Sequence, residues 1–376
     1  MSQLSTSSEP LRALIAAGGT GGHVYPALAV ARLLSEKGWL VDWVGTEFGL
    51  ESRLVRDAGF PLHQVSVSGI RGKSYLVRLK GISRLFLAFW QSLRLMWLLK
   101  PDVVLGMGGY VAGPAGVAAW VTRRPLVIHE QNAVAGTTNR CLRPLARNIL
   151  CGFPGEFSLN QSAREVGNPL RKKMLCQAKS KSDVELAFSA STPFRVLVLG
   201  GSLGAEPLNQ LLPSMVSYFM EMGQDHNLSL WQQCGEQNRH RTDQAWQASS
   251  FKSCRVESYI ENMAEAYDWA HIVIARAGAL TVSELAATGT PAILIPLPHA
   301  IDDHQTCNAQ ILVQSGGALL LPQHQASPKL LAQHLHDLMD SPEKLLEMGR
   351  AARSVARLDA TEQVVAVLKD AAHASC

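Results

Sequence analysis

Two segments of this 376-residue chain share one order of features: an apolar run, a glycine-rich turn and a helical pattern. The first is "LRALIAAGGTGGH" at residues 11–23, and the second is "FRVLVLGGSLGAEPLNQLL" at residues 194–212. Glycine loses more backbone entropy on folding than other residues, so clustered glycines indicate that another group approaches the main chain closely. A strand that passes through such a turn into a helix also exposes backbone N–H groups at the positive helix end, where anions bind.

Short apolar runs alternate with helical segments along both halves of the chain. Examples are "LVDWVG" and "LVIHEQN" in the first half and "HIVIARAG" and "PAILIPLP" in the second. This alternation is typical of βαβ units around a parallel sheet. We therefore predict an α/β fold of two Rossmann-like doubly wound domains in tandem, with an interdomain cleft. The predicted domains are residues 1–170 and 171–352, and the C-terminal helix, 353–376, is a candidate to join the first.

Two nucleotide-binding motifs are excluded. A dinucleotide fingerprint, G-x-G-x-x-G, fails in the first turn because Val24 stands where the third glycine is required. The chain also has no G-x-x-x-x-G-K-[ST] loop of the kind that cradles ATP phosphates. Glycine turns at 18–23, 106–114, 200–205 and 275–284 nevertheless favour a substrate that carries phosphate.

We expect the first helix to begin near Tyr25 and to end near Lys37.

Positive charge is concentrated in the first half of the chain. Residues 1–171 carry 19 Lys and Arg against 10 Asp and Glu, whereas residues 172–376 carry 16 against 21. Residues 71–100 contain seven basic residues and no acid, with apolar side chains at helical spacing. This pattern fits either a core-facing helix with a solvated basic side or a helix that lies on an anionic bilayer. Residues of this candidate membrane and acceptor face are Arg78, Lys80, Arg84, Phe86, Phe89 and Trp90.

Other partners and compartments are less favoured. No groove-reading motif accompanies the basic residues, which argues against nucleic acid. No secretory signal is visible, and no run of eighteen uninterrupted apolar residues could form a spanning helix. The seven cysteines contain no C-x-x-C pair, which is typical of reduced thiols in a cytoplasm.

Eight motifs, in order over nearly the whole chain, resemble the MurG family of bacterial N-acetylglucosaminyltransferases. They are "AAGGTGGHVYPALAVA", "SGIRGK", "KPDVVLGMGGYVAGPAG", "HEQNAVAGTTN", "VGNPLR", "VLGGSLGA", "RAGALTVSELAATGTPAILIP" and "DDHQTCNA". The resemblance implies the two-domain glycosyltransferase B architecture. It implies inverting transfer of N-acetylglucosamine (GlcNAc) from UDP-GlcNAc to the 4-hydroxyl of undecaprenyl-diphosphate-linked muramoyl pentapeptide, which converts lipid I to lipid II in peptidoglycan synthesis. The C-terminal domain would bind the donor, and the N-terminal domain would face the lipid acceptor.

The resemblance also carries expectations about location and partners. It implies a peripheral protein at the cytoplasmic face of the inner membrane, with cell-wall synthesis and division proteins as possible partners. We expect no cofactor and no metal, because no DxD-like pair stands at a strand end beside the glycine turns. A UDP-GlcNAc epimerase of the same architecture is the alternative function, and it would need no lipid-facing surface.

Inversion at an anomeric carbon needs a base, a stabilised oxocarbenium-like centre and a neutralised leaving diphosphate. His23 is a candidate base, because an imidazole is largely neutral at cytoplasmic pH. Glu130, in "HEQN", is a rival base or else a buried carboxylate paired with an arginine. Asn132 resembles the family residue that contacts the donor sugar.

The remaining expectations concern the donor. Backbone groups of the glycine turns and the guanidinium of Arg171 would meet the diphosphate. Uridine would lie against Ile260 and "ALTVSE", Glu284 would accept hydrogen bonds from the ribose hydroxyls, and Gln305 would recognise the GlcNAc hydroxyls. The predicted UDP-GlcNAc contacts are Thr20, Gly21, Gly22, Asn132, Arg171, Ser202, Ile260, Ala279, Leu280, Thr281, Val282, Ser283, Glu284 and Gln305.

Overall fold

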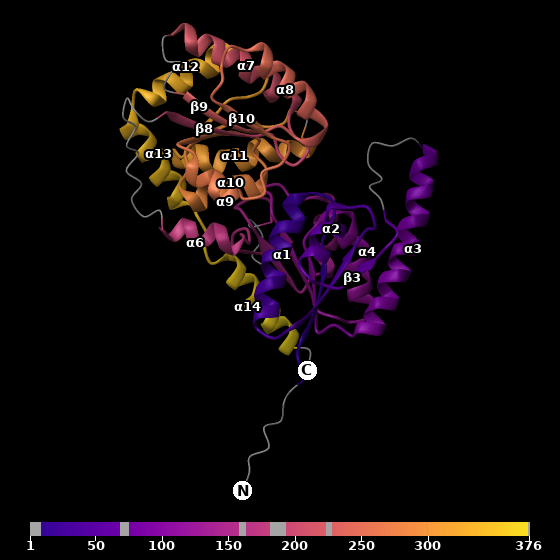
Figure 1. Cartoon of the computed structure of the whole chain (residues 1–376). Coiled ribbons are helices and arrows are strands. Elements are labelled where there is room, and N and C mark those ends of the chain that lie inside the picture. The colour runs from indigo at the N-terminus through magenta and orange to yellow at the C-terminus, as the bar shows by residue number, and fades with distance from the viewer. Residues whose placement is uncertain are drawn as a thin grey trace. The chain divides into compact units, whose positions relative to one another are not determined.

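The computed structural model describes residues 9–67, 75–157, 163–180, 193–222, 228–298 and 300–374, excepting the side chains of 75–82, 177–180 and 301 (Figure 1). The chain divides into two compact units: Met1–Pro169 with Asp359–Cys376, and Leu170–Leu358. Each unit contains one parallel sheet flanked by helices (Figure 1). The predicted fold class, two doubly wound α/β domains in tandem, is confirmed.

The first unit has a seven-stranded sheet of order β3-β2-β1-β4-β5-β6-β7. Its strands are β1 Arg12–Ala16, β2 Leu40–Gly45, β3 Leu62–Gln64, β4 Val103–Gly106, β5 Leu126–Glu130, β6 Asn148–Cys151 and β7 Ala163–Glu165. Its α-helices are α1 Gly21–Glu36, α2 Leu50–Asp57, α3 Tyr75–Leu99, α4 Gly109–Val121, α5 Thr137–Leu142 and α14 Ala360–His373. The C-terminal helix α14 packs beside α1 (Figure 1).

The residues of β1 alternate between two cores because successive side chains of a strand point to opposite faces. Ala13 and Ile15 join the cluster under α1 and α14, whereas Leu14 and Ala16 join the cluster under α3 and α4. All four side chains are fully buried. This two-sided burial explains why the strand is a continuous apolar run.

The second unit has a six-stranded sheet of order β10-β9-β8-β11-β12-β13. Its strands are β8 Phe194–Leu199, β9 Leu228–Gln233, β10 Cys254–Glu257, β11 Ile272–Ala275, β12 Ala292–Leu294 and β13 Ala318–Leu320. Its α-helices are α6 Lys172–Ser180, α7 Glu206–Glu221, α8 Arg239–Ala248, α9 Met263–Trp269, α10 Ala279–Thr288, α11 His304–Ser315, α12 Pro328–Met339 and α13 Pro342–Ser354. α7 and α12 pack together over its larger core (Figure 1).

Both sheets reverse their strand order at the strand that precedes a glycine turn. In the first sheet β1 and β4 are neighbours, and in the second β8 and β11 are neighbours. The chain then leaves each pair toward opposite faces, which opens a crevice at the carboxyl ends of the strands. All four glycine turns of the sequence therefore follow the strands at these two switch points.

The start of the first helix corrects the sequence prediction. The helix α1 begins at Gly21, four residues before the expected Tyr25. Gly19 supplies a positive φ of 97°, and the carbonyl of Thr20 then accepts the N–H groups of both His23 and Val24. Gly21 and Gly22 consequently belong to the first helical turn and not to the loop before it.

Candidate active site

The glycine turn after β1 presents unused backbone donors. The N–H groups of Thr20, Gly21 and Gly22 make no hydrogen bond with the described part of the chain. Such groups at the start of a 16-residue helix face outward with the positive end of the helix dipole. The imidazole Nδ1 of His23 lies 3.3 Å from the hydroxyl of Thr20, in the same first turn. The turn therefore combines anion-binding donors with a titratable ring.

A second glycine turn, after β4, lies against the first. Gly108 and Gly109 have positive φ values of 84° and 74°. A Cβ atom on Gly109 would lie 2.5 Å from the carbonyl oxygen of Gly18, and one on Gly108 would lie 3.2 Å from the Nε2 atom of His23. The positive φ favours glycine at both positions, and a side chain at Gly109 would also clash with the Gly18 carbonyl. The imidazole of His23 packs directly on the backbone of Gly108.

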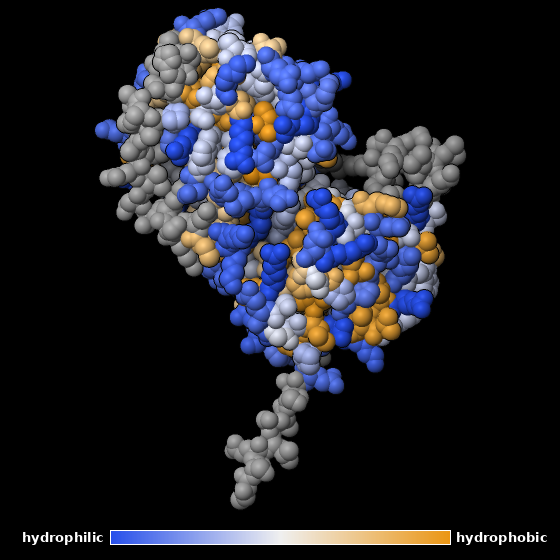
Figure 2. All heavy atoms as spheres, viewed as in Figure 1, coloured by the Kyte–Doolittle hydropathy of each residue, from blue (hydrophilic) through white to orange (hydrophobic). Residues whose placement is uncertain are grey.

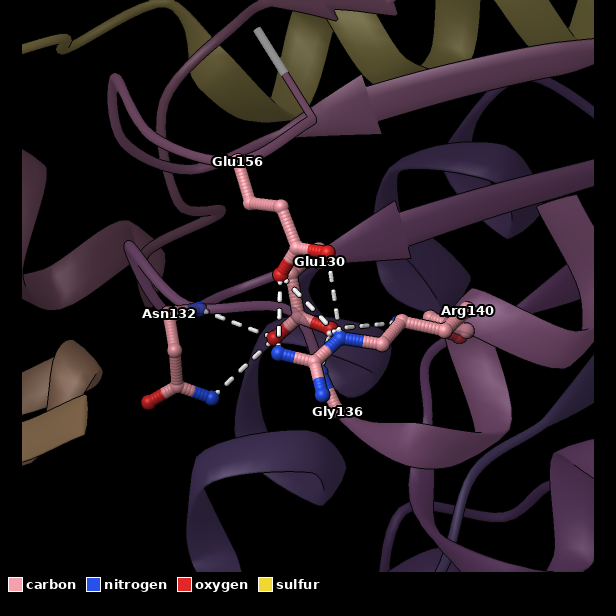
Figure 3. Close-up of polar contacts among 6 residues, drawn as sticks. Glu130, Asn132, Gly136, Arg140 and Glu156 are labelled. Carbon is pink, nitrogen blue, oxygen red and sulfur yellow. Dashed lines mark hydrogen bonds and ion pairs between the residues drawn. The ribbon is translucent and has the colours of Figure 1, made fainter. Parts of the chain in front are cut away.

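Glu130 ends β5 and accepts four N–H groups (Figure 3). The residue as a whole is 4% exposed. Oε1 accepts the backbone and side-chain N–H groups of Asn132, both at 3.1 Å. Oε2 accepts the backbone N–H of Gly136 and the side-chain amide of Asn139, both at 2.9 Å. The side-chain nitrogen of Asn132 therefore faces Glu130, while its oxygen points away (Figure 3).

Arg140 and Glu156 form an ion pair near this carboxylate. The guanidinium Nη2 of Arg140 lies 2.8 Å from Oε2 of Glu156, and Nε donates to both carboxylate oxygens at 3.1 Å (Figure 3). Both side chains are exposed, so the pair contributes little to stability.

The "HEQN" segment also fixes the strand end through His129 and Gln131. His129 is fully buried, and its Nε2 donates to the carbonyl of Gly167 at 2.9 Å while Nδ1 accepts from Gln131 at 3.2 Å. Burial lowers the pKa of His129 to about 4, so the ring is neutral at pH 7. The side chain of Asn168 donates to the carbonyl of Gln131 at 3.0 Å. Together these bonds tie "HEQN" to "VGNP".

Asn139 lies beside these predicted residues but was not predicted from the sequence. It is buried, donates to Glu130, and lies beside Gly108, on which the His23 ring packs. It therefore connects the His23 turn with the Glu130–Asn132 pair. Its position inside the motif "HEQNAVAGTTN" was the one available signal.

In the second unit, Gln233 joins two predicted donor contacts. Its side-chain nitrogen donates to the carbonyl of Gly201 at 2.9 Å, and its oxygen accepts the N–H of Ile260 at 2.9 Å. Ser202, in the same turn, is exposed, whereas Ile260 is buried. Gln233 ends β9, and no sequence motif marked it. The turn after β8 and the Ile260 segment are thus held together by one buried amide.

Glu284 and Arg171 form a partly buried ion pair. Oε1 of Glu284 accepts from Nη2 of Arg171 at 2.9 Å, and Oε2 accepts from the Tyr267 hydroxyl at 3.1 Å. Glu284 is 4% exposed. Burial, together with the Glu284 charge, raises the pKa of Tyr267 well above its ordinary value, which keeps the phenol protonated as a donor. Tyr267 was not predicted from the sequence.

The other predicted donor residues surround the starts of α10 and α11. Gln305 accepts the N–H of Leu297 through its side-chain oxygen at 2.9 Å. Five residues of "ALTVSE" precede Glu284 on α10. Ala279, Val282 and Ser283 are buried, whereas Leu280 and Thr281 are half-buried.

The helix α3 carries large apolar side chains on its surface. Phe86 is 64% exposed and Trp90 is 50% exposed, next to an exposed Arg84, while Phe89 is half-buried. Hydrophobic side chains reach the surface over α3 among hydrophilic ones (Figure 2). The side chains of Arg78 and Lys80 lie outside the described residues. No helix in the described ranges is long and apolar enough to cross a membrane.

Comparison with known proteins assigns the family. Residues 13–151 match the glycosyltransferase family 28 N-terminal domain, and residues 195–364 match the glycosyltransferase family 28 C-terminal domain. The UDP-N-acetylglucosamine–N-acetylmuramyl-(pentapeptide) pyrophosphoryl-undecaprenol N-acetylglucosamine transferase of Marinobacter nauticus is 46% identical over 98% of this chain and 99% of its own length. The crystal structure of Acinetobacter baumannii MurG matches with a TM-score of 0.78 and 37% identity, over 96% of this chain and all of that one.

The chain belongs to the MurG family. The UDP-GlcNAc 2-epimerase of Neisseria meningitidis, solved with UDP-GlcNAc, has a TM-score of 0.67 and 13% identity over 96% of this chain and all of that one. That likeness shows a shared fold alone. Of the eight motifs, the four that contain glycine turns and "HEQNAVAGTTN" lie at the carboxyl ends of β1, β4, β5, β8 and β11. "VGNPLR" follows β7, "DDHQTCNA" lies at the start of α11, and "SGIRGK", at residues 68–73, lies outside the described residues.

Proposed function

We propose that this chain transfers GlcNAc from UDP-GlcNAc to the 4-hydroxyl of lipid I, which forms lipid II. The observation that carries the proposal is 46% identity, over nearly the full length of both chains, with a transferase named for this reaction. In the reaction the bond between the anomeric carbon and the UDP oxygen breaks, and a bond to the acceptor oxygen forms with inversion. The acceptor proton passes to a base, and UDP leaves with the negative charge.

His23 is the proposed base, or the residue that positions the acceptor hydroxyl. Its imidazole lies among outward-facing N–H groups, so a proton acceptor and charge-stabilising donors occur on one turn. Glu130 is the less suitable base because its two oxygens already accept four N–H groups. We therefore assign Glu130 to holding Asn132, whose side-chain oxygen faces away from it and can contact the donor sugar.

The donor contacts are proposed on the second unit. Uridine lies against Ile260 and the first turn of α10. Each Glu284 oxygen has a second lone pair beyond the bonds from Arg171 and Tyr267, which suits acceptance from the ribose hydroxyls. The amide nitrogen of Gln305 is assigned to the GlcNAc hydroxyls, because its oxygen accepts the N–H of Leu297.

Backbone donors are proposed to neutralise the leaving diphosphate. On the first unit these are the N–H groups of Thr20, Gly21 and Gly22, and on the second they belong to the turn around Ser202. Arg171, held by Glu284, is the charged partner. Preorganised donors of this kind stabilise charge as it develops in the transition state.

We further propose a peripheral position at the cytoplasmic face of the inner membrane. The exposed apolar residues of α3, with the basic residues of 71–100, fit an anionic lipid surface on which an undecaprenyl-linked acceptor resides. Cell-wall synthesis and division proteins are further proposed partners.

A transfer assay tests the function. Radiolabel from UDP-GlcNAc should enter a butanol-extractable lipid when lipid I or a short-chain analogue is supplied, and should not enter it without acceptor. An epimerase would instead convert UDP-GlcNAc alone, with no label in the lipid phase. The second outcome would overturn the proposed function.

A further inference from the structure

We propose that Glu51 is a positioning residue that fixes the glycine turn carrying His23. This inference rests on the proposed function, because it concerns the geometry of that same site. Glu51 lies in the first turn of α2 and is fully buried. An acid in a first helical turn commonly does no more than favour the helix dipole from the surface. The carboxylate of Glu51 is buried instead of lying at the surface.

The carboxylate connects two loops at the carboxyl edge of the first sheet. Oε2 accepts the N–H of Gly19 at 3.1 Å, and Oε1 accepts the backbone N–H and the hydroxyl of Thr46 at 3.0 and 2.7 Å. The β1–α1 turn and the β2–α2 loop are therefore held by one side chain. Gly19 is the residue whose positive φ directs the chain into α1.

Three glycines leave the space that this carboxylate occupies. A Cβ atom would lie 2.8 Å from Oε1 of Glu51 at Gly18, 2.7 Å from its Cγ at Gly45, and 2.2 Å from both of its oxygens at Gly49. A smaller side chain would not require all three glycines, and the hydrogen bonds from Gly19 and Thr46 require acceptor oxygens in this space. The backbone is thus shaped around a carboxylate.

The carboxylate also influences the third loop of the edge. The ring of Tyr110, on α4, lies 3.4 Å from the Cβ position of Gly19. Burial and the Glu51 charge raise the pKa of the Tyr110 phenol. No Lys, Arg or His among the described residues forms an ion pair with Glu51.

A buried carboxylate without a cation is costly unless hydrogen bonds satisfy it. Apolar packing of α2 on the sheet would not require a buried carboxylate. Holding two backbone N–H groups at once does require two acceptor oxygens on one rigid group. By holding Gly19, Glu51 directs the following N–H groups of Thr20, Gly21 and Gly22 outward. It also places His23 on the backbone of Gly108.

Replacing Glu51 by glutamine tests this role. A carboxamide has one acceptor oxygen, so it satisfies either the N–H of Gly19 or that of Thr46 and sets its own N–H₂ against the other. We expect Glu51→Gln to lower kcat about 10- to 100-fold, as for loss of a preorganised donor set, with the KM for UDP-GlcNAc changed about twofold or less. Loss of the negative charge alone would strengthen anion binding at the turn. A fall in kcat therefore reports geometry.

Two further measurements make the result decisive. Hydrogen exchange of a peptide spanning residues 17–24 should be faster in Glu51→Gln than in the wild type, with peptides of the second unit unchanged. Thr46→Val removes one donor and keeps the backbone amide, so it should lower kcat in the same direction by about 3- to 10-fold, as for loss of one ordinary hydrogen bond. If Glu51→Gln does not fold, the kcat of Thr46→Val alone tests the role of Glu51. Glu362→Gln, an exposed carboxylate in the first turn of α14 of the same unit, is the matched control and should retain normal kcat.

Normal kcat in Glu51→Gln, or in Thr46→Val where only that variant folds, would overturn the inference. So would unchanged exchange at residues 17–24, or a KM for UDP-GlcNAc that rises as much as kcat falls. The exchange measurement needs no turnover. It therefore separates failure of this inference from failure of the proposed function, which absence of transfer by the wild-type chain would reveal.

Discussion

His23 is the residue whose loss should reduce turnover most. General acid–base groups contribute about 10²- to 10⁴-fold, so His23→Ala should lower kcat by at least about 100-fold. The affinity for UDP should change little, because the proposed uridine contacts are on the second unit. Steady-state kinetics with a lipid I analogue, and calorimetry with UDP, measure the two effects. His240→Ala, on the exposed surface of α8, is the control. Near-normal turnover in His23→Ala would remove His23 from the mechanism.

Glu130 and Asn132 should behave as one unit in mutagenesis. Glutamine at position 130 cannot accept all four N–H groups, so Asn132 should lose its orientation. We expect Glu130→Gln and Asn132→Ala each to lower kcat about 10- to 100-fold, and the double variant to be about as impaired as the worse single variant. Losses that multiply in the double variant would show independent roles and would favour Glu130 as the base.

The end of β5 should be sensitive to pH through His129. Its pKa is lowered to about 4, below the ordinary value of 6.5, so the folded state binds fewer protons than the unfolded state. The stabilisation that comes from keeping His129 neutral is fully present above pH 6.5, and it is lost as the pH falls toward 4. Between pH 7 and pH 5 this group should lower the free energy of unfolding by about 2 kcal/mol. Urea unfolding of the wild type and His129→Gln measures it. A variant with the same pH dependence as the wild type would contradict this account.

The helix α3 should bind anionic membranes through its exposed aromatic side chains. Phe86→Glu combined with Trp90→Glu should abolish co-sedimentation with vesicles that contain phosphatidylglycerol, and Arg78→Glu with Lys80→Glu and Arg84→Glu should weaken it. Tyr218→Glu, on the exposed face of α7, should bind normally and serves as the control. Binding that does not depend on anionic lipid, or that survives both sets of changes, would favour a helix that only packs on the core.

At the scale of the whole molecule, the sequence predicted the two sheets because their buried strands are short apolar runs separated by glycine turns and helical patterns. Local patterns also pointed to His23 after β1, whereas the motifs that carry the family resemblance pointed to Glu130 and Glu284. The roles of these three residues stay predictions. The start of α1 was placed four residues too late, because glycines suggest a loop even where they enter a first helical turn.

Contacts between distant segments could not be predicted in the same way. Glu51 reaches Gly19 across 32 positions, and Gln233 reaches Gly201 across 32 and Ile260 across 27. Nothing in the spacing of these residues distinguishes them from a helix acid or a strand-end amide. Their importance follows from burial and from the backbone groups that they hold, which only the packed sheets bring together.

The structure of the lipid product tests the central claim most directly. Nuclear magnetic resonance of the purified product from UDP-α-GlcNAc and a lipid I analogue gives both the linkage and the anomeric configuration. The account predicts one new β-linked GlcNAc on the 4-hydroxyl of the muramoyl residue, as inversion requires. An α-linked sugar, a bond to another hydroxyl, or release of UDP with no new glycoside would contradict it.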